Sequence, residues 1–346
     1  MPQTWPDVLT TLVAGRDLDA STTVWAMDQI LAGEATDSQI AGFAVALRAK
    51  GETAEELRGL ADAMLARATR LEIPGRFVDI VGTGGDRART VNISSMSAVV
   101  AAGAGVGVVK HGNRAASSSS GTADVFEVLD IRLDVPAERI PDVFARCGIT
   151  FCFAPVFHPS FRHTAVPRRE LGIATPFNFL GPLTNPAQPA ASAIGCADVR
   201  MAPLMASVFA ARGHDAFVFR GEDGLDEITI TASTRVWEVT GGVVQESVLD
   251  PRELGFELAA PESLRGADPV FNADVFRRIV GGEVSPVRDA VLLNAGAAIA
   301  AHAAESGPLL ERLAAGVERA KESIDSGAAA ETLAQWSAAT QALAQR

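Results

Sequence analysis

The chain contains few cysteines for its 346 residues, and their pattern excludes two kinds of structural scaffold. Its three cysteines, Cys147, Cys152 and Cys196, are an odd number and include no CxxC pair. Such a set supports neither a disulfide framework nor a zinc site. We therefore expect reduced, buried thiols in a protein of the cytoplasm.

Basic charge is also scarce over the chain as a whole. Lysine and arginine together number 30 against 42 acidic residues, which gives a formal net charge of −12. Generic binding to nucleic acid or to an anionic membrane needs a net basic surface, because cationic side chains must replace the counterions. We expect neither partner, so any anion site must be a local basic patch.

Long hydrophobic runs are missing too. The longest apolar stretch, residues 97–109, is shorter than the roughly 20 residues that a membrane-spanning helix needs. The start of the chain lacks the basic segment and apolar run of a secretion signal. Hydrophobic residues nevertheless make up 48%, as in a globular enzyme, and the length suits two lobes rather than one.

The first seventy residues have the pattern of short amphipathic helices. Thr36 with Gln39, and Thr53 with Glu56, have the spacing of helix-capping boxes, and apolar residues follow each at helical intervals. A Pro-Gly pair at residues 74–75 then interrupts the helical period. We place a lobe boundary there.

Beyond this boundary, short apolar runs alternate with helical segments. The expected strands are residues 77–81, 106–109, 149–153, 193–196 and 216–219. Strands that alternate with helices predict an α/β fold with a mostly parallel sheet covered by helices. Residues 236–244 are typical of an antiparallel hairpin, and residues 289–304 of a buried helix.

A glycine-rich motif, GTGGD at residues 82–86, directly follows the first expected strand and precedes a helical segment. Glycine lets backbone N–H groups approach an anion closely, and the N-terminus of a helix adds positive potential. The motif therefore suits a phosphate, although a tight structural turn explains it equally well.

Acidic residues are absent between Asp86 and Asp124, where about four would be expected from the composition. The same window contains Arg87, Arg89 and the run KHGNR at residues 110–114, which follows the second expected strand. Open α/β folds bind ligands at the carboxyl ends of their strands. A basic window without carboxylates at this edge predicts a polyanion site.

Three more segments suggest ligand binding, each with an alternative. The serines of residues 117–120 form either a flexible loop or a hydroxyl-rich phosphate site. Asp226 and Glu227 follow the fifth expected strand and can share Mg²⁺, although acids also gather in surface turns. Arg168 can hold a carboxylate through paired hydrogen bonds, whereas exposure on a helix accounts equally well for Arg169.

Together, these motifs resemble those of the anthranilate phosphoribosyltransferases. The matching segments are GTGGD at residues 82–86, NISS at 92–95, KHGNR at 110–114, FNFLGPLTNPA at 177–187 and the acidic pair at 226–227. The family transfers the phosphoribosyl group of phosphoribosyl diphosphate (PRPP) to the amino group of anthranilate, in tryptophan biosynthesis. Diphosphate is released, and Mg²⁺ is required.

The resemblance also implies an architecture. A helical lobe of residues 1–72, joined by a segment at about residues 170–190, would be hinged to a larger α/β lobe of residues 73–346. This is the nucleoside phosphorylase and phosphoribosyltransferase type of fold. Members of the family are generally homodimers formed through the helical lobe.

Carried over residue by residue, the resemblance assigns residues to three ligands: PRPP, anthranilate and magnesium. PRPP would be held by Gly82, Gly85, Asp86, Thr90, Asn92, Ile93, Ser94, Ser95, Lys110, His111, Gly112, Asn113, Arg114, Ala115, Ala116, Ser117, Ser118 and Thr122. Anthranilate would contact Gly82, Asn113, His158 and Arg168, and magnesium would bind Ser94, Asp226 and Glu227. No catalytic base is assigned, because an aryl amine is already neutral at neutral pH.

Some residues depart from the family's usual pattern. These are Arg87, Ser95, Met96, Ser119 and Phe161. The first four bear on PRPP affinity, and the core PRPP ligands are intact. Phe161 lacks the hydroxyl of a tyrosine that some relatives carry, which removes one polar contact to anthranilate.

Three other functions fit parts of the pattern. A nucleoside phosphorylase of the same broad fold would use free phosphate without the acidic pair or Mg²⁺. A nicotinamide-dependent dehydrogenase needs an acid about 20 residues after its glycine motif, where this chain has none. A catalytically silent paralogue that binds nucleic acid or regulates is opposed by the acidic balance and the complete ligand set.

Overall fold

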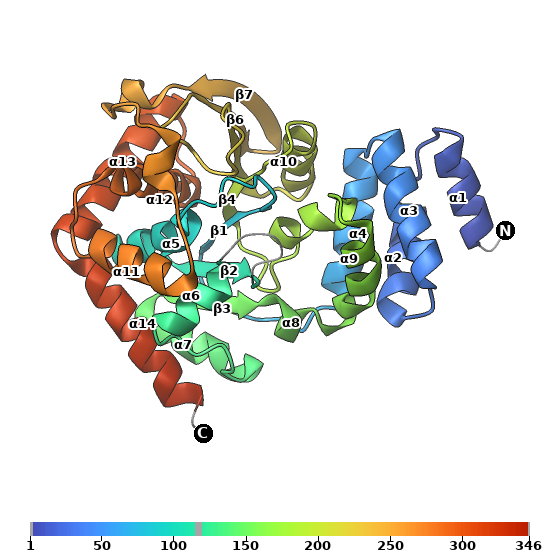
Figure 1. Ribbon diagram of the computed structural model, residues 1–346, viewed down its shortest axis with the longest axis horizontal. Helices are drawn as coiled ribbons and strands as arrows, with labels where there is room; N and C mark the ends of the chain where they lie inside the picture. Colours follow the sequence, from blue (N-terminus) through green and yellow to red (C-terminus); the bar gives the residue numbers. More distant parts are fainter. Residues whose placement is uncertain (1–2, 115–119, 345–346) are drawn as a thin grey trace.

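Four helices at the start of the chain form a bundle: α1 (Trp5–Val13), α2 (Ala20–Ala32), α3 (Asp37–Lys50) and α4 (Ala54–Ala66). The computed structural model, which describes residues 3–114 and 120–344, places this bundle at one end of the molecule (Figure 1). Both predicted capping boxes are confirmed, at Thr36 with Gln39 and at Thr53 with Glu56. The paired bonds satisfy N–H groups that the start of a helix leaves without partners.

A seven-stranded mixed sheet forms the centre of the larger domain, in the order β3-β2-β1-β4-β5-β6-β7. The parallel strands are β1 (Val78–Gly82), β2 (Val108–Gly112), β3 (Ile149–Phe153), β4 (Ala191–Gly195) and β5 (Asp215–Gly221). β6 (Thr234–Thr240) and β7 (Val243–Leu249) form the predicted antiparallel hairpin. The predicted strands are confirmed, with β2 beginning at Val108 rather than at residue 106.

The strand order reverses between β1 and β4. The chain runs from β1 through β2 to β3 on one side, and then returns to place β4 and β5 on the other side. The carboxyl ends of β1 and β4 therefore flank a topological switch point, which is where open α/β folds bind their ligands. This geometry locates the site before any side chain is considered.

Helices cover both faces of the sheet. α5 (Ile93–Gly103) and α12 (Pro286–Ala303) pack on one face, supported by α13 (Leu309–Asp325) and α14 (Ala328–Ala344). α10 (Met201–Ala211) packs on β5 and β6 from the other face and also contacts α4. α12 confirms the buried helix predicted at residues 289–304. Among the helices of the described residues, none is long and apolar enough to cross a membrane.

Further helices complete the larger domain. α6 (Thr122–Val128) follows the KHGNR segment, α7 (Ile140–Cys147) precedes β3, and α11 (Pro269–Val280) contacts both α5 and α6. α11 therefore lies close to the start of α5 although it comes late in the chain.

Between β3 and β4, the chain returns to the helical bundle through residues 154–190, which we call the interdomain segment. This return comprises α8 (Ala154–Phe157), α9 (Ala165–Leu171) and 3₁₀ turns at Pro159–Thr164, Pro176–Phe179 and Gly181–Leu183. Phe177, Phe179, Leu180 and Leu183 are buried in one apolar core with α1 to α4, and this core continues to α10. The division between the lobes at residues 72 and 73 stays a prediction.

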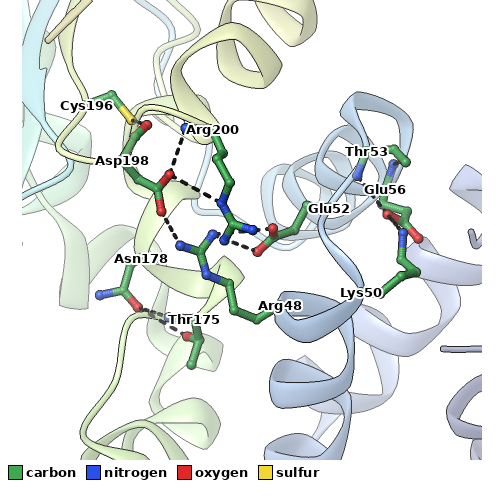
Figure 2. A network of polar contacts seen from close by, with 10 residues as sticks. All are labelled: Arg48, Lys50, Glu52, Thr53, Glu56, Thr175, Asn178, Cys196, Asp198 and Arg200. Atoms are coloured by element: carbon green, nitrogen blue, oxygen red, sulfur yellow. Dashed lines mark hydrogen bonds and ion pairs between the residues drawn. The ribbon is translucent and has the colours of Figure 1, made fainter. Parts of the chain in front are cut away.

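An ion-pair network also joins the two domains (Figure 2). Arg48 on α3 donates to Glu52 and to Asp198, which lies in the loop after β4. The Arg48 guanidinium also lies 5.5 Å from the centroid of the Phe179 ring. The loop at the switch point is thereby attached to the helical domain.

Candidate active site

The GTGGD loop leaves the carboxyl end of β1 in a conformation that glycine favours. Gly84 and Gly85 have φ angles of +68° and +90°. Arg87 and Arg89 also lie in the left-handed region, at φ 61° and 54°. Left-handed residues interspersed in a turn make backbone N–H groups converge, which is a recurrent way of binding anions. The loop therefore has the backbone geometry of a phosphate site.

The N-terminus of α5 points to the same edge of the sheet. Asn92 is the N-cap residue of α5, yet its side chain makes no capping bond and donates to the Ser120 carbonyl at 3.4 Å. The backbone N–H of Ser94 donates to Glu227 Oε1 at 3.2 Å. This bond places a carboxylate at the positive end of a helix, where negative charge is stabilised.

The acidic pair sits against the ends of β1 and β4. Asp226 Oδ2 accepts the backbone N–H of Gly84 at 2.7 Å. A Cβ atom at Gly82 would lie 2.1 Å from Asp226 Oδ2, and one at Gly195 would lie 1.6 Å from the Asp226 carbonyl oxygen. Glycine at the ends of both strands is therefore what allows the acidic loop to approach the sheet so closely.

Burial at this edge disfavours the ionised forms of Asp226 and Glu227. Burial, followed by the charge of Asp86, raises the pKa of Asp226 to about 7. Burial and the charge of Asp226 likewise raise the pKa of Glu227. Like charges in a desolvated site favour the protonated forms, and a bound cation reverses that preference. The acidic pair is therefore suited to bind a cation.

The donor set suits magnesium rather than a metal held by protein alone. Within the part of the chain that the structure describes, no group of three or more His, Cys, Asp or Glu side chains is arranged to hold a metal ion. Mg²⁺ is usually held by one or two carboxylates, with waters and substrate phosphates completing its shell. Asp226 and Glu227, with Ser94 beside them, fit that description.

Lys110 is a buried cation close to the acidic pair. It lies on β2 with no exposed surface, and its Nζ donates to the Ile80 carbonyl and, at 3.3 Å, to Ser94 Oγ. Burial lowers the pKa of Lys110 to about 8, against the opposing charges of Asp79 and the acidic pair. The ammonium group therefore supports Ser94 from the protein interior.

His111 of the KHGNR segment and His158 lie side by side. The ring centroids of His111 and His158 are 5.2 Å apart. His111 Nδ1 donates to the Gly181 carbonyl at 2.9 Å, and His158 Nε2 donates to the Thr184 carbonyl at 2.8 Å. Burial lowers the pKa of His111 to about 3 and that of His158 to about 4. Both rings are therefore neutral, and each binds the interdomain segment through a fixed nitrogen.

Arg168 on α9 has the surroundings of a carboxylate-binding residue. It is half-buried, and its guanidinium lies 5.4 Å from the centroid of the Phe161 ring. Burial lowers the pKa of Arg168. Among residues 3–114 and 120–344, the structure gives it no ion-pair partner. A desolvated guanidinium without an acid is suited to a planar carboxylate from a ligand.

Two family models match the chain. The helical bundle domain of the glycosyl transferase family covers residues 6–68, and its a/b domain covers residues 74–330. An anthranilate phosphoribosyltransferase from Nocardioides sp. is 63% identical over 97% of this chain and 99% of its own length. The chain belongs to the anthranilate phosphoribosyltransferase family.

Solved structures of anthranilate phosphoribosyltransferases share the fold. The enzyme from Thermus thermophilus superimposes with a TM-score of 0.90 at 39% identity, covering 97% of this chain and 99% of its own. The enzyme from Saccharomyces cerevisiae in complex with PRPP and Mg gives 0.89 at 26% identity, covering 99% of both chains. The family and the fold class predicted from the sequence are confirmed.

The structure brings together eight of the residues that the family resemblance assigns to PRPP and magnesium. Gly82, Asp86, Ser94, Lys110 and the acidic pair lie in one group at the carboxyl edge, and Ser95 Oγ donates to Thr122 Oγ1 at 3.2 Å. Thr90 lies in an isolated bridge with Arg265. Ala115, Ala116, Ser117, Ser118 and the departure at Ser119 lie outside the described residues. The roles of the individual residues stay predictions.

Arg114 does not face the phosphate loop in this structure. Its guanidinium donates to Asp124 and Glu127 on α6 and lies 5.6 Å from the centroid of the Phe153 ring. These carboxylates raise the pKa of Arg114 further. A direct contact between this side chain and PRPP would require the ion pairs to open.

One buried aspartate, Asp79, was not predicted from the sequence. Asp79 lies inside β1 with no exposed surface, and it accepts the His111 backbone N–H at 3.1 Å and the Asn185 side-chain amide at 2.9 Å. Burial raises the pKa of Asp79 to about 6. It connects β1, the KHGNR segment and the interdomain segment. The signal that points to it is an acidic residue inside an otherwise apolar strand.

Proposed function

We propose that this protein transfers the phosphoribosyl group of PRPP to the amino nitrogen of anthranilate, giving N-(5-phosphoribosyl)anthranilate and diphosphate in tryptophan biosynthesis. The observation that carries the proposal is the convergence at the switch point of the glycine loop, the N-terminus of α5 and the acidic pair. Membership of the family supports the same reaction.

PRPP would lie along the carboxyl edge of β1 and β2. The left-handed glycines of the GTGGD loop and the N-terminus of α5 suit its phosphates. Ser94, Asp226 and Glu227 would hold Mg²⁺. When bound, this ion neutralises negative charge on the diphosphate and makes it a better leaving group.

In the reaction, the bond between ribose C1 and a diphosphate oxygen breaks, and its electron pair leaves with the diphosphate. The nitrogen lone pair of anthranilate forms the new bond to C1, and the nitrogen then releases a proton. The protein positions the two reactants and stabilises charge, and these effects supply most of the rate enhancement in such a mechanism. Arg168, by holding the carboxylate, would turn the amine toward C1.

The acidic pair favours this reaction over phosphorolysis of a nucleoside. A phosphorylase would bind free phosphate, and nearby carboxylates would repel that anion unless a cation were bound. Burial raises the pKa of both Asp226 and Glu227, so two charged carboxylates at this edge are disfavoured unless a cation is bound. The structure therefore suits a substrate that arrives with magnesium.

A homodimer formed through the helical domain belongs to the same proposal. Val13 on α1 is 80% exposed and Val45 on α3 is 38% exposed, so the bundle presents apolar side chains to its surroundings. Sedimentation velocity should give twice the mass of the chain, and a monomer at micromolar concentration would contradict this part. We also place the enzyme in the cytoplasm, which suits its three cysteines without disulfides.

The direct test is the loss of anthranilate fluorescence on mixing purified protein with anthranilate, PRPP and Mg²⁺. We expect a loss that requires all three and that a chelator stops. A parallel reaction with free phosphate and a nucleoside tests for nucleoside phosphorylase activity. Folded protein that leaves anthranilate fluorescence unchanged would contradict the proposed function.

A further inference from the structure

Asn272, on the first turn of α11, contacts the NISS motif from outside the predicted set of ligands. It is 2% exposed, and its Nδ2 donates to Asn92 Oδ1 at 2.9 Å. Its own Oδ1 accepts the backbone N–H of Ala267 at 2.9 Å. Asn92 in turn donates through Nδ2 to the Ser120 carbonyl. We call the chain Ala267, Asn272, Asn92, Ser120 the amide relay.

The two ends of the amide relay fix the direction of every bond in it. A backbone N–H at Ala267 can only donate, and a carbonyl at Ser120 can only accept. Asn272 must therefore turn its oxygen to Ala267 and its NH₂ group to Asn92. Asn92 must then turn its oxygen to Asn272 and its NH₂ group toward Ser120. Reversing either amide would set two donors or two acceptors face to face.

The donor end of the relay is rigidly held. Thr90 and Arg265 form an antiparallel bridge, and the Gly266 N–H donates to the Arg89 carbonyl at 2.8 Å. A Cβ atom at Gly266 would lie 2.8 Å from Asn272 Oδ1 and 2.8 Å from the Thr90 carbonyl oxygen. Only glycine allows this approach, so the segment before α11 and the segment before α5 are closely packed together.

We propose that Asn272 is a positioning residue for PRPP, acting through Asn92. The NH₂ group of Asn92 carries two hydrogens, and in the described part of the chain the Ser120 carbonyl is the acceptor for one of them. The second is presented to an oxygen of PRPP. Phosphate and ribose ring oxygens accept hydrogen bonds, so an Asn92 amide turned the other way would repel them. This inference rests on the proposed function.

The variant Asn272→Asp reverses the relay at one atom. It keeps an oxygen for the Ala267 N–H and replaces the NH₂ group that faces Asn92 by a second oxygen. We expect the KM for PRPP to rise about tenfold, with kcat and the KM for anthranilate changed less than about twofold. Val270→Asp is the matched control, because it adds the same charge to the same turn at a side chain that is 66% exposed. The control should leave all three constants unchanged.

A double-mutant cycle separates the relay from a general structural effect. Asn272→Ala should weaken PRPP binding when Asn92 is present. In an Asn92→Ala background, it should cause no further loss of PRPP binding. Additive losses in the two backgrounds would overturn the proposal. So would an unchanged KM for PRPP in folded Asn272→Asp, and the alanine cycle decides the matter if that variant does not fold.

Calorimetric titration of PRPP and Mg²⁺ into the protein without anthranilate gives a readout independent of turnover. The relay predicts about tenfold weaker PRPP binding for Asn272→Ala. A wild type that binds PRPP without consuming anthranilate would contradict the proposed function and leave the relay standing if the variant binds more weakly. A wild type that turns over while both proteins bind PRPP equally would overturn the relay alone. A wild type without PRPP binding would overturn both.

Discussion

Replacing Gly82 by alanine would test how the acidic pair is positioned. Gly82 ends β1, and its backbone lies outside the left-handed region, so alanine can adopt it. A Cβ atom there would lie 2.1 Å from Asp226 Oδ2 and 2.9 Å from its Cγ, whereas real Cβ contacts under 3.0 Å essentially do not occur. The Asp226 carboxylate would therefore have to move by about 1 Å.

This displacement should affect metal binding far more than stability. The atoms that must move are at the end of a side chain, so we expect the free energy of unfolding to fall by about 1 kcal/mol, the low end for overpacking. Mg²⁺, in contrast, demands near-ideal geometry at about 2.0–2.1 Å from its ligands. A misplacement of about 1 Å in a site can cost about 100-fold. We expect the Mg²⁺ concentration for half-maximal turnover to rise between about tenfold and 100-fold.

Two other glycines provide matched comparisons. A Cβ atom at Gly181 would meet nothing within 4 Å, so Gly181→Ala should change neither quantity. At Gly195 it would lie 1.6 Å from the Asp226 carbonyl oxygen and 2.4 Å from its carbon, which no side-chain rotation relieves. Gly195→Ala should therefore lose stability as well, by about 1–3 kcal/mol.

The assay is turnover as a function of Mg²⁺ for the wild type and the three variants, with thermal unfolding of each. An unchanged magnesium titration in Gly82→Ala, at a wild-type Tm, would refute the role of Asp226 as a metal ligand. Loss of stability equal to that of Gly195→Ala would refute the argument that the side chain alone moves.

Three further predictions concern the same site. Asp226→Asn removes a charge from the proposed metal site, so it should raise the Mg²⁺ concentration needed for turnover, measured by the same titration; no change would contradict the assignment. Arg168→Ala should raise the KM for anthranilate far more than that for PRPP, and equal effects on both constants would argue against a carboxylate contact. The pKa of His158 is lowered to about 4 in the folded protein, so the unfolded chain binds more protons between about pH 4 and 6.5. The contribution of His158 to the free energy of unfolding is therefore lost as the pH falls through this range, by about 1.4 kcal/mol per pH unit. Denaturant unfolding at pH 7 and pH 5 should show this loss of unfolding free energy in the wild type and not in His158→Gln. The raised pKa of Asp79 acts in the opposite direction in both proteins, so it cancels from their difference; equal slopes would show that His158 is not held neutral.

The elements that the sequence predicted well are those whose causes are local. The helices after Thr36 and Thr53 begin where their capping boxes place them, because the bonds form within one turn. The strands that begin at Val78 and Ile149 are short apolar runs bounded by turn residues. The turn of the GTGGD loop at the carboxyl edge was also predictable, since a strand followed by glycines and a helix fixes its direction.

The reasons for particular residues in the site were not predictable in the same way. The GTGGD glycines suggested room for a phosphate, yet Gly82 also makes room for Asp226, which lies far along the chain. Arg114 had the sequence position of a phosphate ligand, and the structure pairs it with two acids of α6. Each outcome depends on which side chains meet across the sheet edge, and spacing along the chain does not carry that information.

By itself, the sequence determined the class of fold, the family, and the chemistry available at the carboxyl edge, because capping, periodicity and motif spacing are properties of neighbouring residues. Only the tertiary structure decided how those groups are oriented. Asn92 and Asn272 are 180 positions apart, and their amide directions follow from a backbone donor and a backbone acceptor that folding brings to the two ends of one relay. Hydrogen-bond direction and burial arise from packing between distant segments, so they exist only once the chain has folded.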